Sequence, residues 1–399
     1  MRGRDLCEEF IQHFHGTVFS GLIGGAIEVY ARSAGWRSVD DSPRPIPFAV
    51  AALPHNMQQA QFVAIVPLLG NEMASAVQSK MGPWYSYVHD LETAHAANPC
   101  QIGILPYLLD SGATHGTVLG DVFSKYQYIA ANPVSEGDTE QSLRCRDLAQ
   151  GIAQLLSPPG SERLTAFISH TKRNSPGEEE NVEALITTVR DAIRNTRLRE
   201  FFDASDLQPG QDWDAELRGK AATSALLALR TDLYPSREWC QREILIAKRE
   251  GMPVIIMDAL GKAEERGSFL MDHVPRVAAR IADGRWRKAD ILMALNLLVD
   301  ECLKRVLWRR QEELARRDLA LDIAWWAPHA PEPITLTKWL EDQRREGKLL
   351  IEGEDVLVLH PDPPLGAEER VVLQQMLSFG GVNRKLDVMT PRLLAARGG

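Results

Sequence analysis

The sequence predicts an α/β protein whose middle segment, residues 162–300, forms a parallel β-sheet with helices on both faces. In this segment short apolar strands alternate with amphipathic helices, the order typical of a covered parallel sheet. The strand expected at Val254–Met257 is apolar at every position, as burial on both faces requires. The chain has 399 residues, of which 44% are hydrophobic and 25% charged, enough for two or three domains with packed cores.

Two breaks rich in turn-forming residues divide the chain. Ser157–Ser161 follows an expected helix over 141–156, and Pro328–Pro333 follows a long charged helix expected around 300–318. We therefore expect a regulatory α/β segment at 1–157, the central domain at 162–300, and a helix with a small α/β unit at 301–399.

The elements of the middle segment follow from apolar periodicity. Strands are expected at Leu164–Ser169, Glu200–Asp203, Ala225–Leu229 and Val254–Met257, and helices at Glu178–Asn195, Asp212–Thr223 and from Ser236 to Arg249. Ser236 is the expected N-cap of the last helix, because a serine hydroxyl can accept from the free amide groups of the first turn. This order returns each strand to the same sheet.

The flanking segments show a similar rhythm. At the N-terminal end we expect strands at Ile46–Leu53, Gln61–Leu69 and Ile102–Leu109, and a helix at Tyr85–Ala97. At the C-terminal end we expect strands at Asp355–His360 and Lys385–Met389, and a helix at Ala367–Leu377. The loop Asp362–Gly366 follows a strand, where α/β folds bind ligands, although a rigid turn that ends the strand is the better explanation.

Composition narrows the classes of function. The net charge of -9 argues against non-specific binding to nucleic acids or anionic membranes. The most apolar early stretch, Val18–Tyr30, is too short to span a bilayer, and Cys7, Glu8 and Glu9 interrupt any signal peptide. The five cysteines lack zinc-ligand spacing, so we expect free thiols, no metal site and a cytoplasmic protein.

The strongest local signal is a tryptophan followed four residues later by a glutamate. Trp239 and Glu243 share one face of the expected helix, one turn apart. An indole and a carboxylate side by side suit a nicotinamide riboside: the positively charged ring stacks on Trp239. Glu243 then binds the ribose hydroxyls and stabilises an oxocarbenium ion as the N-glycosidic bond breaks. The same spacing also fits a core aromatic beside a solvated acid.

Four motifs follow one another between Leu164 and Leu260, about a quarter of the chain. They are Ala166–Thr171, Phe202–Asp203 with Asp206–Gly210 and Trp213, Ala225–Leu229 with Tyr234–Glu243, and Ala247–Lys248 with Pro253–Ile256. In order and spacing this set resembles a TIR (Toll/interleukin-1 receptor) domain: its first strand and loop, its second strand and BB loop, its third strand with the following helix, and the end of its pattern. The resemblance implies a flavodoxin-like fold for this segment.

Enzymatic members of this family cleave NAD to nicotinamide and ADP-ribose or a cyclic variant. The resemblance implies that Glu243 is the catalytic residue and Trp239 the stacking residue, with NAD as substrate and no cofactor. Where the family often has an aspartate, this chain has Lys172–Asn174, whose cations either contact the pyrophosphate or form a solvated basic loop. The other expected substrate contacts are Phe167, Ser169, His170, Asp206 and Ser236, although Asp206 also fits a turn-shaping role, and Cys240 is expected to be a buried packing residue.

The resemblance also implies a setting. Bacterial TIR proteins of this kind deplete NAD during phage infection, gated by oligomerisation or a second messenger, so we expect self-association and a nucleotide or protein trigger. The alternative is a non-catalytic TIR scaffold that signals by self-association, but such adaptors commonly lack an acid at the position of Glu243. The strand–loop–Trp84–helix–strand order of the N-terminal segment is either a degenerate repeat or an unrelated unit, and Val88 stands where the acid would be.

Overall fold

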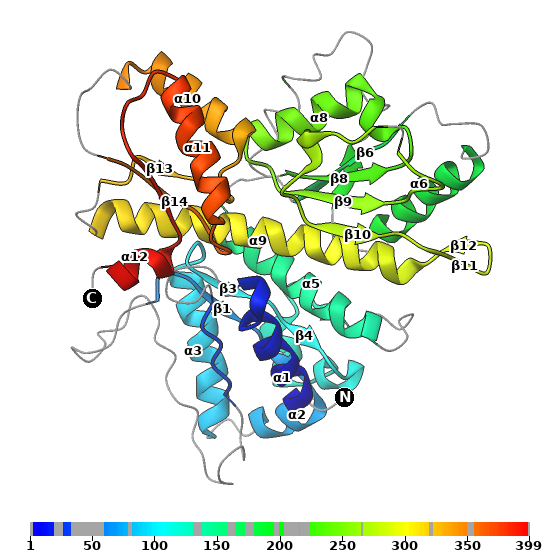
Figure 1. Cartoon of the computed structure of the whole chain (residues 1–399). Helices are drawn as coiled ribbons and strands as arrows, with labels where there is room; N and C mark the ends of the chain where they lie inside the picture. Colours follow the sequence, from blue (N-terminus) through cyan, green and yellow to red (C-terminus); the bar gives the residue numbers. More distant parts are fainter. Residues whose placement is uncertain are drawn as a thin grey trace. The chain divides into compact units, whose positions relative to one another are not determined.

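The chain forms two compact units in the computed structural model (Figure 1). The structure describes residues 3–19, 27–32, 60–78, 82–130, 138–157, 164–171, 179–194, 199–202, 215, 224–264, 266–318, 322–348 and 355–397. One unit comprises Met1–Gly16 with Ile27–Ser161, and the other Thr17–Ala26 with Glu162–Gly399. The strand expected at 46–53 lies outside the described residues, as does the helix expected at 212–223 apart from Ala215.

The N-terminal unit contains short parallel strands and helices. Its strands are β1 Val63–Ile65, β2 Leu68–Leu69, β3 Ile102–Ile104, β4 Tyr107–Leu108 and β5 Ile129–Ala130. Its helices are α1 Gly3–Phe14, α2 Asn71–Val77, α3 Pro83–Ala97, α4 Val118–Phe123 and α5 Asp138–Leu156, with the short η2 Ser111–Thr114. The strand β1 pairs with β3, and β2, β4 and β5 form a second parallel sheet.

Two prolines split the strands of this unit. The single strand expected at Gln61–Leu69 is β1 and β2, interrupted before Leu68, and the one expected at Ile102–Leu109 is β3 and β4. Pro67 and Pro106 fall in the two interruptions and have no amide hydrogen to donate to a ladder. The two breaks lie opposite each other. The segments 63–69 and 102–108 therefore leave the first sheet and enter the second at the same level.

The N-terminal unit could be a degenerate repeat of the central segment, because Trp84 and its helix follow the same order of elements as Trp239. Trp84 lies in α3 and is partly buried against the core of the unit, and Val88 is fully buried in that core. The helix α2, which we did not expect, stands between β2 and α3. The sheets here have two and three strands, so the degenerate repeat stays a prediction.

The second unit contains a five-stranded parallel sheet in the order β10-β9-β8-β6-β7. Its strands are β6 Thr165–Ser169, β7 Arg199–Phe202, β8 Ser224–Arg230, β9 Val254–Asp258 and β10 Arg276–Ala278. When the five strands are numbered along the chain and read from β7 to β10, their order is 2-1-3-4-5, which is flavodoxin-like. The predicted α/β class and parallel sheet are confirmed, and the sheet has one more strand, β10, than we expected.

Helices cover both faces of this sheet (Figure 1). They are α6 Glu179–Arg194, α8 Glu238–Arg249 and the long α9 Lys288–Asp318. One face carries α8, with a buried cluster that includes Phe167, Leu226, Ile256, Cys240, Ile244 and Ala247. On the other face α6 and α9 pack against each other, and α9 contacts β8, β9 and β10. The sheet is thus buried on both sides, as its apolar strands require.

The end of α8 is set by Gly251. Its φ of 63° lies in the left-handed region, which favours glycine. Met252 N–H donates to Ala247 O at 2.8 Å and Gly251 N–H to Lys248 O at 3.0 Å, the two bonds of a Schellman motif. The Arg305 guanidinium of α9 also approaches so closely that an added Cβ would lie 2.8 Å from Nη2. This turn directs the chain into β9.

The predicted boundary at residue 300 falls inside a helix. The helix α9 runs without interruption from 288 to 318, and the compact unit continues to the C-terminus. Beyond it, β13 Trp325–Trp326, β14 Val356–Leu359 and β15 Leu386–Met389 form a parallel sheet in sequence order, with α10 Pro333–Arg345, α11 Ala367–Phe379 and α12 Pro391–Arg397. The small elements of the unit are η1 Thr17–Phe19, η3 Tyr234–Ser236, η4 Phe269–Met271, β11 Ile281–Ala282 and β12 Arg285–Trp286.

A buried ion pair joins α8 to α10. Lys248 Nζ lies 2.9 Å from Glu332 Oε2 and also donates to Asp272 O at 2.6 Å. Burial lowers the pKa of Lys248 and raises the pKa of Glu332, and their attraction offsets these shifts only in part. A second pair joins Arg249 to Glu341. The last turn of α8 is therefore held by charged contacts with the C-terminal elements.

Candidate functional site

The candidate site lies at the carboxyl edge of the five-stranded sheet. Ser169 is the last residue of β6, and Tyr234 begins η3 shortly after β8. The strands β6 and β8 are neighbours in the sheet. The strand order reverses at β6, because β7 lies on one side of it and β8 on the other. Open α/β sheets bind ligands at such a position. The helix α8 then brings Glu243 to the same edge.

The Glu243 carboxylate is buried, with an exposed fraction of 3% for the residue. The Ser169 hydroxyl donates to Oε2 of Glu243, and the Ser169 Oγ also pairs with the Tyr234 hydroxyl. Tyr234 is fully buried. These residues are far apart in the sequence, so the sheet and α8 have to form before the three side chains can meet.

Burial keeps the neighbours of this carboxylate protonated. The pKa of Tyr234 is well above its usual value, because burial and then the nearby Cys240 and Glu243 disfavour the phenolate. The same factors, burial first and Glu243 second, raise the pKa of the Cys240 thiol to about 12. Neither group therefore adds a negative charge beside Glu243 at neutral pH.

Trp239 lies one helical turn before Glu243 and is 42% exposed. The Arg242 guanidinium carbon lies 5.6 Å from the centroid of its ring. A core aromatic beside a solvated acid would have the opposite exposures. At this site the indole is on the surface and the acid is inside.

The other predicted contacts differ in depth. Phe167 is fully buried in the cluster beneath α8, so its side chain does not reach the surface. His170 is partly buried at the end of β6, where its Nδ1 lies 3.2 Å from Thr171 O and its carbonyl accepts from the Cys240 thiol at 3.7 Å. Cys240 is buried, as predicted, and all five cysteines are free thiols.

Ser236 does not cap α8. It lies in η3, and its hydroxyl donates to Leu233 O at 2.8 Å. The N-cap is Arg237, because the short helix η3 extends through Ser236 and displaces the start of α8 by one residue. Ser236 is exposed at the same edge of the sheet as Trp239. The predicted contacts Lys172 and Asp206 lie outside the described residues.

Tyr234 lies in the TIR-like motif but was given no role at the site from the sequence, and the polar residues at the end of β8 and after it were not singled out. The Asp232 carboxylate accepts from Gly261 N and Lys262 N, both at 3.0 Å, which fixes the loop after β9. Arg230 pairs with Asp258 at 2.8 Å. The available signal was that these polar residues lie at the carboxyl end of an apolar strand or just after it, because the ends of parallel strands meet at one edge of the sheet.

Among the residues that the structure describes, no group of three or more His, Cys, Asp or Glu side chains could hold a metal ion. None of the helices described combines the length and apolar character needed to cross a membrane.

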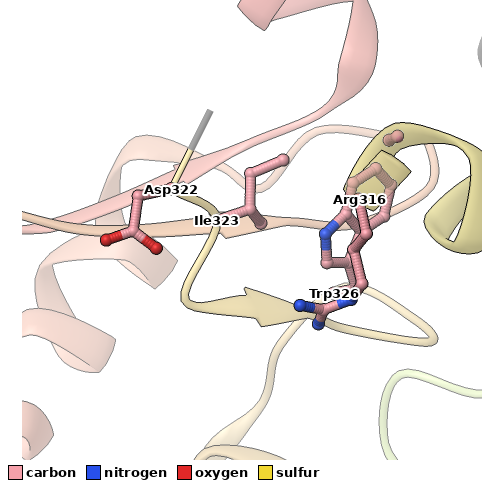
Figure 2. Close-up of a pocket in the computed structure, with 5 residues that line it drawn as sticks. Arg316, Asp322, Ile323 and Trp326 are labelled. Carbon is pink, nitrogen blue, oxygen red and sulfur yellow. The ribbon is translucent and has the colours of Figure 1, made fainter. Parts of the chain in front are cut away.

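A hollow of about 150 Å³ is lined by Ala315, Arg316, Asp322, Ile323 and Trp326 (Figure 2). None of the predicted site residues lines this hollow.

Comparisons with known proteins add little to this geometry. No family model matches the chain, and no curated protein matches it. Among solved structures, a Bacillus subtilis protein described as a candidate phosphosugar isomerase matches with 10% identity and a TM-score of 0.21, over 60% of this chain and 80% of that one. A likeness at this TM-score carries no argument about fold or function.

Proposed function

We propose that residues 162–300 cleave the N-glycosidic bond of NAD, giving nicotinamide and ADP-ribose or a cyclic variant. The observation that supports this most is the pairing of a buried carboxylate, Glu243, with an exposed indole, Trp239, on one turn of α8. Burying a carboxylate is costly, and such acids are found preferentially where chemistry uses them. The pair also lies at the edge of the sheet where α/β folds bind ligands.

Each residue of the pair has a role in this reaction. The nicotinamide ring carries a positive charge before the bond breaks, and the face of Trp239 attracts it. Because the Arg242 guanidinium lies over this ring, nicotinamide either stacks on the opposite face or displaces Arg242. As the bond breaks, positive charge moves to the ribose, and Glu243 stabilises it in a poorly solvated site, where the attraction is strong.

The depth of Glu243 adds a requirement for access. With 3% exposure, its carboxylate cannot contact the ribose hydroxyls until neighbouring groups move. The arrangement described here is then a resting state, and binding of substrate or of a second copy opens it. This agrees with the gating by self-association or by a nucleotide or protein trigger that the family resemblance implies. The proposed setting is antiviral defence by depletion of NAD.

The decisive experiment replaces Glu243 with Gln in the purified full-length chain. The change keeps the size of the side chain and removes its charge, so nicotinamide release should fall by about 10²–10³-fold or more. The matched control is Glu238→Gln, which removes an exposed acid from the first turn of the same helix and should keep the wild-type rate. Nicotinamide and ADP-ribose are measured by chromatography, and circular dichroism checks the fold.

The alternative is a non-catalytic scaffold. In that case the wild-type chain would release no nicotinamide at any protein concentration, with or without extract from infected cells, and Glu243→Gln would change only self-association. Retained cleavage by a folded Glu243→Gln protein would instead keep the activity and remove Glu243 from the mechanism.

A further inference from the structure

We propose that Tyr234 and Ser169 form a hydroxyl relay that orients the Glu243 carboxylate and keeps it ionised inside the protein. The three groups are linked in series: the Ser169 Oγ pairs with the Tyr234 hydroxyl and with Oε2 of Glu243. Ser169 was predicted as a substrate contact, but Ser169 is 2% exposed and Tyr234 is fully buried. Both are therefore positioning residues, which act on substrate through Glu243. The inference rests on the proposed function, because it gives Glu243 a task that needs its charge.

The direction of the relay follows from the number of protons. An ionised carboxylate only accepts hydrogen bonds, so the single proton of the Ser169 hydroxyl points to Glu243. The Ser169 Oγ is then left as an acceptor, and the Tyr234 hydroxyl has to donate to it. Tyr234 keeps its proton across the physiological pH range, since burial raises its pKa well above the usual value. The relay therefore donates in one direction, toward the carboxylate.

The relay is anchored in rigid parts of the fold. Ser169 is the last residue of β6 and is in register with Ala228 of β8. The Tyr234 amide donates to Thr231 O at 3.0 Å, and the Tyr234 carbonyl accepts from Arg237 N at 3.2 Å. Neither hydroxyl can follow the carboxylate far if Glu243 turns away. The relay thus favours one orientation of the carboxylate.

The physical need for the relay comes from burial. Moving a carboxylate out of water favours its protonated form, and hydrogen bonds donated to the charged form oppose this effect. Among the described residues, the titratable groups near Glu243 include Tyr234, Cys240, Arg237 and His170. The Cys240 thiol also hydrogen-bonds with the Ser169 hydroxyl and donates to the His170 carbonyl. Cys240 is protonated at neutral pH. The positive charge of Arg237 acts on the same cluster, since it lowers the pKa of the Cys240 thiol and so opposes part of the effect of burial.

The test is the pH profile of kcat at saturating NAD for four variants of the full-length chain. Ser169→Ala removes the direct donor and should move the acid limb upward by about one pH unit, which is about a tenfold loss of kcat below the midpoint, with little change in KM. Tyr234→Phe should move it less. Ser169→Thr keeps a hydroxyl and should restore the profile toward wild type. Ser169→Ala combined with Tyr234→Phe should equal Ser169→Ala alone, because Tyr234 acts through Ser169.

Other outcomes overturn the relay. Lower kcat with an unmoved acid limb in Ser169→Ala would show that the serine has only a packing role. Independent, additive shifts from the two single variants would show that Tyr234 does not act through Ser169. A rise in kcat in either variant would show that the hydroxyls restrain Glu243 from reaching substrate, and not that they prepare it.

A second measurement separates the relay from the proposed function. Glutamate labelled with ¹³C in the carboxyl group allows the titration of Glu243 to be followed by NMR, and its signal is the one missing in Glu243→Gln. Ser169→Ala should move the midpoint upward whether or not the chain cleaves NAD. If wild type is inactive and the midpoint moves, the relay stands and the proposed function fails. If wild type is active and the midpoint does not move, only the relay fails.

Discussion

The exposures of Trp239 and Glu243 invert the usual distribution on a surface helix. A solvated glutamate costs nothing, and a buried tryptophan contributes more apolar burial than most side chains. Here the acid is 3% exposed and the indole 42% exposed, so packing and solvation alone would favour exchanging them. The proposed binding of a cationic ring next to a forming carbocation would account for both positions.

Replacing Trp239 with Ala is expected to weaken catalysis with little effect on folding. The loss of the stacking face should lower kcat/KM for NAD by about tenfold, seen as a higher KM and a lower kcat. Trp239→Phe keeps a smaller aromatic face, so its kcat/KM should lie between those of the wild type and Trp239→Ala. Phe379→Ala, which removes an exposed aromatic from α11, is the matched control. Steady-state kinetics and thermal unfolding would measure both effects, and unchanged kinetic constants in Trp239→Ala would refute the stacking role.

At this scale the sequence indicates which residues share a face, but not their depth. The four-residue spacing of Trp239 and Glu243 placed them on one helical turn, and α8 confirms it. Their exposures depend on how α8 rests on the sheet, which no local pattern contains. Tyr234 was missed as a partner of Ser169 for a similar reason: the two meet only after β6, β8 and η3 are assembled.

At the scale of elements, apolar periodicity located the strands and helices around the site to within a residue or two. The expected strand at 164–169 is β6 Thr165–Ser169, and the expected helix at 178–195 is α6 Glu179–Arg194. The departures occurred at prolines. Pro67 and Pro106 divide the strands expected at 61–69 and 102–109. The turn expected over 328–333 ends one residue early, because Pro333 begins α10, where the missing amide hydrogen is harmless.

The buried pair between α8 and α10 gives a prediction about stability. Lys248→Met leaves the Glu332 carboxylate buried without its cation, which should lower the free energy of unfolding by about 3 kcal/mol. The double variant Lys248→Met with Glu332→Leu removes both charges and should recover most of this loss. Burial disfavours both charged forms here, since the pKa of Lys248 is lowered and that of Glu332 is raised.

The sign of each pKa shift gives the pH dependence of this pair. Between the lowered pKa of Lys248 and 10.5, the folded state binds fewer protons than the unfolded state, so stability rises with pH. Between 4.5 and the raised pKa of Glu332, the folded state binds more protons, so stability falls as pH rises. Both slopes should be absent in the double variant. Denaturant unfolding across these pH windows tests this, and equal stability of Lys248→Met and wild type would contradict it.

At the scale of the molecule, the continuity of α9 determines which isolated fragment should fold. Cutting at residue 300 removes the second half of α9, including the buried Leu303, Leu307 and Trp308. We therefore expect residues 162–399 to unfold cooperatively as an isolated fragment, and residues 162–300 to be poorly folded. Circular dichroism and thermal denaturation of both fragments test this. Cooperative unfolding of 162–300 with full helix content would show that the C-terminal elements are dispensable for the central sheet.

The activity should depend on protein concentration more steeply than in direct proportion. The TIR resemblance implies a site completed by a neighbouring copy, and the depth of Glu243 requires a rearrangement before substrate can reach it. A contact that favours the open arrangement hundredfold needs only about 2.7 kcal/mol, which one small interface supplies. Nicotinamide release per unit protein should therefore rise with concentration, in parallel with the oligomer fraction measured by light scattering. Mixing an excess of Glu243→Gln protein with a little wild type should raise the wild-type rate, because the inactive copy still provides the contact. Strictly proportional activity across a wide concentration range, with no response to the inactive copy, would show that each chain opens and cleaves on its own.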